Sequence, residues 1–183
     1  MKVEYFIGIV PPSDYIERIE QFRSKWTSQS GVEPHITVKA QGGLTPDKKW
    51  LDQIRKVCVN VKPFPISLDE PNFLGDHILY LSVHSDGLHQ LHRKLVHEIS
   101  PSEDLIKQYF ELNAYIPHLT LVKGHNGGNS SAGPAEQNLK QIMGSVVEEL
   151  TPYPDFEVNF IRVYELNFET QVCEKYEDIT LGY

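Results

Sequence analysis

Apolar residues recur with two different periods along the chain, which predicts short strands separated by amphipathic helices. The opening segment 2–10 is rich in β-branched and aromatic residues and ends at Pro11-Pro12, so it predicts a strand. Segment 14–28 carries apolar residues at helical spacing and predicts a helix. The first half is then completed by a short strand over 34–39, a helix over 45–61, and strands over 64–68 and 77–83.

The same order of elements then runs a second time. The predicted elements are a helix over 86–99, a strand over 117–123, a helix from Pro134 to Leu150, and strands over 156–168 and 176–181. Two long copies indicate a duplication rather than a solenoid. Because helices and hairpin strands mix without strict βαβ alternation, the pattern favours an α+β fold. No linker divides the chain, which predicts one bilobal domain over 1–183 with a central cleft.

Turn and cap residues mark the ends of these elements. Thr45-Pro46 has the form of a helix N-cap followed by proline at the first helical position. Pro71-Asn72 and Gly75-Asp76 are typical of turns. The Gly/Asn/Ser stretch 124–133, which includes His125, predicts a connecting loop beside the cleft.

The composition restricts the class of ligand and the compartment. Formal net charge is −8 over 183 residues, which excludes a broad basic surface that coats nucleic acid but allows a small local anion site. No apolar run approaches the ~18 residues of a membrane span, and no secretory signal is expected at the N-terminus. Cys58 and Cys173 have neither disulfide-framework nor zinc spacing, so we expect reduced thiols in a cytoplasmic protein.

Two short strands each carry a Pro-His-apolar-Thr tetrad. Side chains on a strand alternate between faces, so His35 shares a face with Thr37, and His118 shares a face with Thr120. The apolar neighbours point the other way and can be buried; they are Ile36, Val38, Leu119 and Leu121. Because the tetrad occurs at equivalent places in both copies, we predict a functional rather than a purely structural role for it.

Two imidazoles and two hydroxyls suit phosphate chemistry. With an ordinary pKa near 6.5, one histidine can accept a proton while the other donates one, which is worth about 10²–10⁴-fold in rate. Threonine hydroxyls can donate hydrogen bonds to the non-bridging oxygens of a phosphate. Such a reaction requires no metal and no cofactor. We therefore predict His35 and His118 as catalytic residues and Thr37 and Thr120 as substrate-binding residues.

The paired tetrads resemble the two signature motifs of the 2H phosphoesterase superfamily, whose bacterial members include RNA 2',3'-cyclic phosphodiesterases, also called 2'-5' RNA ligases. Residues 5–12 also resemble the first strand of that family. The order of the predicted elements and the 83-residue separation of the two histidines agree with the family over nearly the whole chain. The sequence after the first motif is closer to a small, poorly characterised phosphoesterase branch.

The resemblance implies two lobes, each with an antiparallel sheet and outer helices. It implies opening of a 2',3'-cyclic phosphate on a nucleotide or RNA end, usually to a 2'-phosphate. We assign His118 as the base and His35 as the acid.

Two lysines are candidates for further phosphate contacts. Many ligase-like relatives carry arginine where this chain has Lys123, although strand phase places Lys123 with the apolar residues unless the strand bends first. Lys39, by contrast, is in phase with His35 and Thr37.

Other functions stay open. The same site could bind a phosphorylated ligand or RNA end without turnover, or the histidines could be metal ligands. A histidine cluster around the third helix is interpreted as surface residues because no acidic or cysteine partner completes a metal set; it comprises His84, His89, His92 and His97. Aromatic residues that could stack on a base are expected to be mostly core; they are Tyr5, Phe6, Tyr80, Tyr115 and Tyr164.

Overall fold

The computed structural model describes residues 2–27, 31–124 and 136–182. Its strands are β1 (Val3–Ile9), β2 (Ile36–Lys39), β3 (Phe64–Leu74), β4 (Ile78–His84), β5 (His118–Lys123), β6 (Asp155–Val158), β7 (Phe160–Asn167) and β8 (Val172–Thr180). Its helices are α1 (Ser13–Ser24), α2 (Trp50–Val59), α3 (Asp86–Ile99), α4 (Glu103–Gln108), α5 (Glu136–Leu150) and the 3₁₀ turn η1 (Leu112–Ala114).

The strands form one antiparallel sheet in the order β6-β3-β4-β5-β2-β1-β7-β8. The two halves of the sheet meet where β5 pairs with β2, through Ile36 opposite Leu119. Each half has four strands, and the strands that carry the two tetrads are the innermost pair. This arrangement confirms the predicted α+β fold with two related halves.

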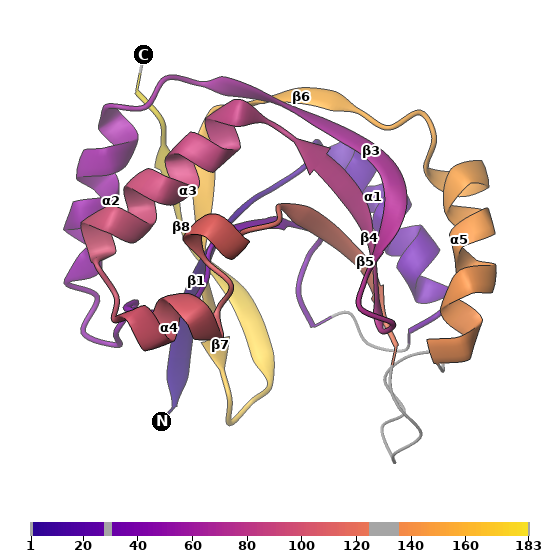
Figure 1. Cartoon of the computed structure of the whole chain (residues 1–183), viewed down its shortest axis with the longest axis horizontal. Coiled ribbons are helices and arrows are strands. Elements are labelled where there is room, and N and C mark those ends of the chain that lie inside the picture. The colour runs from indigo at the N-terminus through magenta and orange to yellow at the C-terminus, as the bar shows by residue number, and fades with distance from the viewer. Residues whose placement is uncertain (1, 28–30, 125–135, 183) are drawn as a thin grey trace.

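Helices cover the two halves in an exchanged order (Figure 1). Helix α1 follows β1 but packs with α5 on the other half, against β5, while α3 follows β4 but packs with α2 against β2. The two halves are thus intertwined. Among the described residues, no helix is both long and apolar enough to cross a membrane.

The apolar face of the central strands forms the core. Ile36, Val38, Leu119 and Leu121 are all buried, and they pack with apolar residues of the surrounding helices. Because successive side chains of a strand point to opposite faces, the polar residues of both tetrads lie on the other face of the sheet. Cys58 is buried and Cys173 is half-buried, and neither forms a disulfide.

Several predicted boundaries are wrong because tertiary contacts override local signals. Helix α2 begins at Trp50 rather than at 45, since the Thr45 hydroxyl bonds to Asp47 and caps no helix. Strand β3 continues through Pro71-Asn72, because an irregularity after Asp69 absorbs the proline. The predicted strand 156–168 is two strands that join opposite halves of the sheet.

Two segments differ from the predicted pattern in other ways. Residues 125–135 contain most of the Gly/Asn/Ser stretch together with His125 and lie outside the described residues, so the structure does not test the expected connecting loop. Residues 103–114, for which no element was predicted, form α4 and η1 and lead into the second tetrad.

Candidate active site

The register of the central strands brings the two tetrads together. Antiparallel pairing on either side of Ile36 and Leu119 places Thr37 beside His118 and His35 beside Thr120, all four on the face opposite the core. Diagonal neighbours across an antiparallel pair are about 7–8 Å apart. The two imidazoles can therefore flank a phosphate group with one hydroxyl beside each.

Both histidines are held by the same local hydrogen bond. Nδ1 of His35 lies 2.8 Å from the carbonyl oxygen of Glu33, and Nδ1 of His118 lies 2.7 Å from the carbonyl oxygen of Ile116. Because a carbonyl only accepts, Nδ1 must carry the proton in each ring. Nε2 is then the nitrogen left to exchange protons with a substrate.

The His35 ring packs in an aromatic cluster. Its centroid is 5.1 Å from the Phe6 ring and 5.3 Å from the Tyr164 ring, and those two rings stack on each other. A Cβ at Gly8 would approach the Tyr164 ring to 3.1 Å and the His35 ring to 3.4 Å. Gly8 thus leaves room for this packing, a role typical of glycine inside a strand.

The environment of His35 favours its neutral form. Burial is the largest cause that lowers the pKa of His35 to about 4, and the positive charges of Arg23 and Lys123 lower it further. The hydrogen bond to the Glu33 carbonyl opposes this effect. At neutral pH, Nε2 of His35 is therefore a proton acceptor.

An ion-pair network supports the segment that orients His35. The Glu33 carboxylate accepts from the Tyr164 hydroxyl and from Nη1 of Arg162, both at 2.7 Å. Arg162 also donates twice to Asp178. Glu33 thus connects two contacts of His35, because its carbonyl accepts from the ring and its carboxylate fixes Tyr164.

The prediction that Lys39 shares the site with His35 and Thr37 is wrong. Thr37 pairs with Gly8 but Lys39 pairs with Ile7, so Val38 is an extra residue that forms a β-bulge. After the bulge, the Lys39 side chain turns to the face of Ile7, where it is fully buried and its ammonium group donates to Glu111, Ala40 and Gly42.

A bulge has the opposite consequence for Lys123. Thr120 pairs with Tyr80 but Val122 pairs with Leu79, so Leu121 is the extra residue. Val122 then faces the core, and Lys123 returns to the face of His118 and Thr120. The effect of its charge on His35 agrees with this position. The strand therefore bends before Lys123, and its contact with phosphate stays a prediction.

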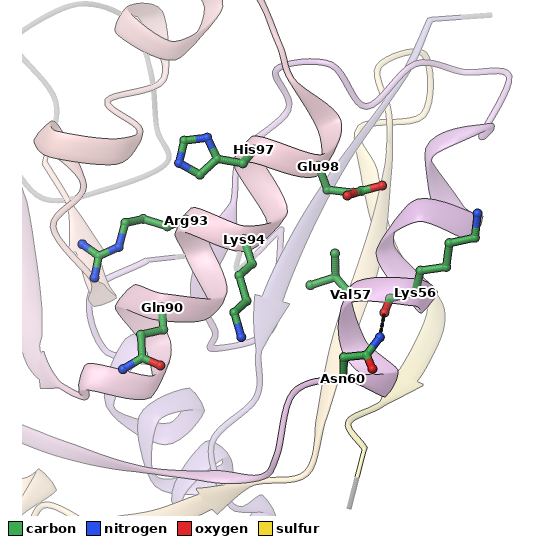
Figure 2. A pocket seen from close by; sticks show the side chains of 8 residues that line it. All are labelled: Lys56, Val57, Asn60, Gln90, Arg93, Lys94, His97 and Glu98. Atoms are coloured by element: carbon green, nitrogen blue, oxygen red, sulfur yellow. Dashed lines mark hydrogen bonds between the residues drawn. The ribbon is translucent and has the colours of Figure 1, made fainter.

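A surface groove between α2 and α3 lies apart from the tetrads. Figure 2 shows this groove, where Lys56 and Arg93 point away from each other. None of the four tetrad residues lines it. Within the described part of the chain, no three His, Cys, Asp or Glu side chains are placed to hold a metal ion.

The sequence interpretation missed several residues that shape the site. The sequence predicts a surface position for His92, but the residue is buried and its ring stacks on that of Tyr115, with the two centroids 3.8 Å apart. Its position four residues after Leu88, on the apolar stripe, was the available signal. Arg23, Glu33 and Arg162 gave no such signal, because most partners of their side chains are distant in the sequence.

The duplicated α+β fold, with the two tetrad strands adjacent at the middle of the sheet, is that of the 2H phosphoesterases. The chain belongs to the 2'-5' RNA ligase superfamily, whose family model matches residues 10–167. A search of curated proteins finds no match.

Solved structures share the whole fold at low sequence identity. TT0787 of Thermus thermophilus has a TM-score of 0.64 and 13% identity, with 97% of each chain covered. LigT of E. coli, complexed with 3'-AMP, has a TM-score of 0.63 and 15% identity, with 100% of each chain covered. A further phosphoesterase has a TM-score of 0.62 and 14% identity, again with 100% of each chain covered. At these identities the likeness shows the fold alone.

Proposed function

We propose that this protein is a metal-independent phosphoesterase that opens cyclic phosphodiesters, such as the 2',3'-cyclic phosphate of a nucleotide or RNA end. The observation that carries the proposal is the matched anchoring of His35 and His118 on adjacent strands, which leaves Nε2 of each ring available. The LigT structures with 3'-AMP and with phosphate support a nucleotide phosphate as the ligand class. We also propose that the protein acts in the cytoplasm.

The proposed step is an in-line displacement at phosphorus. Thr37 and Thr120 donate to the non-bridging oxygens, and Lys123 offsets their negative charge. Nε2 of His35 takes a proton from water as its oxygen bonds to phosphorus, and the bond to one ring oxygen breaks. Nε2–H of His118 protonates that leaving oxygen. Because burial favours the neutral form of His35, we propose His35 as the base and His118 as the acid, in place of the opposite assignment made from the sequence.

The test is a substrate screen in EDTA. It compares 2',3'-cyclic mononucleotides, ADP-ribose cyclic phosphate and RNA with a cyclic end, with products identified by ³¹P NMR. We expect hydrolysis of at least one substrate, unaffected by the chelator. Tight binding of a 2'-phosphate without any turnover would instead identify a binding module. Activity lost in EDTA and restored by a divalent cation would identify a metal enzyme.

The pH dependence of kcat/KM tests the role of His35. Since kcat/KM reports the free enzyme, its acid limb should lie near pH 4, the pKa of His35, rather than near the ordinary histidine value of ~6.5. Lys123→Gln removes a positive charge that lowers this pKa, so the limb should move to higher pH. An acid limb near ~6.5 in the unsubstituted enzyme would contradict the assignment of His35 as the base.

Folding must be followed alongside activity at low pH. His35 and His92 both have a folded-state pKa of about 4. The unfolded chain binds more protons between that value and ~6.5, so the free energy of unfolding decreases as pH falls through this window. Circular dichroism at each pH separates this loss from the acid limb.

A further inference from the structure

The two tetrad strands have a β-bulge at the same place. In β2 the extra residue is Val38, directly after Thr37, and in β5 it is Leu121, directly after Thr120. A bulge interrupts the regular ladder and changes the face to which the following side chains point. The position of Lys123 therefore depends on the second bulge being kept.

At the bulge of β5, one buried arginine from α1 contacts the backbone. Arg23 donates from Nε to the Leu121 carbonyl at 3.2 Å and from Nη2 to the Thr120 carbonyl. Its Nη1 donates to the Val32 carbonyl, three residues before His35. A planar guanidinium spreads its donors over three nitrogens and so reaches carbonyls that lie apart, whereas an ammonium group donates from one nitrogen only.

At the bulge of β2, two side chains contact the equivalent carbonyls. His92 of α3 donates from Nδ1 to the Val38 carbonyl at 2.7 Å, and the Tyr115 hydroxyl donates to the Thr37 carbonyl at 2.8 Å. Nε2 of His92 accepts from the Leu112 amide, so both ring nitrogens are occupied. Helices α1 and α3, which follow β1 and β4, thus supply donors to matching positions.

We infer that Arg23 and the His92–Tyr115 pair are positioning residues that hold matched bulges in the two tetrad strands, and that Arg23 thereby directs Lys123 to the site. On each strand the side-chain donors bond to the carbonyl of the tetrad threonine and to the carbonyl of the extra residue that follows it. This agreement between the two strands supports a specific positioning role rather than general helix packing. Buried carbonyls at an interrupted ladder need such donors. The inference rests on the proposed function only in taking phosphate as the ligand of the site.

The test is a double-mutant cycle of Arg23→Lys with Lys123→Met. Arg23→Lys keeps the charge and leaves one donor nitrogen in place of three, so a change in binding reflects position rather than electrostatics. We expect each single variant to weaken inorganic phosphate binding about 10-fold, measured by calorimetry. In the Lys123→Met background, Arg23→Lys should have less than about a 2-fold effect, because the side chain that it positions is already missing.

Arg18→Lys is the matched control. Arg18 lies on the same helix and donates to the Glu149 and Thr151 carbonyls, away from both bulges. We expect it to leave phosphate affinity unchanged. Additive effects of Arg23→Lys and Lys123→Met, or wild-type affinity in Arg23→Lys, would overturn the inference.

Two further measurements separate this inference from the proposed function. A crystal structure of Arg23→Lys should show Lys123 displaced from the face of His118, whether or not the protein cleaves any cyclic phosphate; an unchanged bulge would refute our inference. If Arg23→Lys does not fold, Tyr115→Phe removes only one hydroxyl. It should weaken phosphate binding about 3- to 10-fold, because Tyr115 holds the part of β2 that carries Thr37, and an unchanged phosphate affinity would refute the role of Tyr115.

Discussion

His35→Ala and His118→Ala should each lower kcat/KM on the cleaved cyclic phosphate by at least about 10²-fold, because each removes one partner of the proton transfer. Initial rates with the best substrate of the screen measure this loss. Since the two rings act in one step, the double variant should be little slower than the slower single variant. Full activity in either single variant would refute the proposed mechanism.

The controls must separate chemistry from folding. His97→Ala removes an exposed histidine on α3 and should leave the rate unchanged. His35 packs against Phe6 and Tyr164, so truncation to alanine also removes aromatic contacts. His35→Gln keeps more of the side-chain volume and should lose comparable activity. Thermal unfolding of each variant shows whether the loss accompanies a loss of stability.

The tetrads could be predicted because their alternation is local. The side chains on either side of Ile36 and Leu119 point away from the core, as period-two alternation requires. The sequence could not predict which way Lys39 and Lys123 turn, since that depends on two bulges. In this protein the bulges are contacted by residues from distant segments, Arg23 and His92. The local pattern of apolar and polar residues in a strand carries no information about such contacts.

Longer-range errors have the same origin. The strand predicted over 156–168 has a continuous β-like pattern, yet β6 pairs with β3 and β7 pairs with β1. Which neighbour a strand finds is decided by the exchanged arrangement of the two halves and not by its own residues. The family resemblance supplied the global arrangement, and the structure adds the aromatic cluster and the ion-pair network beside His35.

Glu111→Ala should lower the free energy of unfolding by about 3–5 kcal/mol, because it leaves the buried Lys39 ammonium without its counter-charge. Nζ of Lys39 lies 2.8 Å from Oε1 of Glu111, and the side chains of the two residues are 0% and 2% exposed, respectively. Burial lowers the pKa of Lys39 and Glu111 opposes that effect, so the carboxylate keeps the ammonium charged. Urea unfolding at neutral pH measures the loss.

Lys25 and Glu149 provide a matched surface control. Their 2.7 Å ion pair has the same chemistry, but the side chains are 55% and 31% exposed. Glu149→Ala should cost no more than about 1 kcal/mol, since solvent screens the exposed pair. Equal losses in the free energy of unfolding for Glu111→Ala and Glu149→Ala would show that burial does not increase the contribution of Glu111 to stability.

Replacement of both buried partners distinguishes an unpaired charge from lost packing. In Lys39→Met with Glu111→Leu no charge remains to be buried, so the double variant should recover most of the stability lost in Glu111→Ala. A double variant as unstable as Glu111→Ala would mean that the hydrogen bonds of Lys39 to Ala40 and Gly42 matter more than the ion pair. Recovery would show that Lys39 contributes to stability through charge pairing with Glu111 at the end of β2.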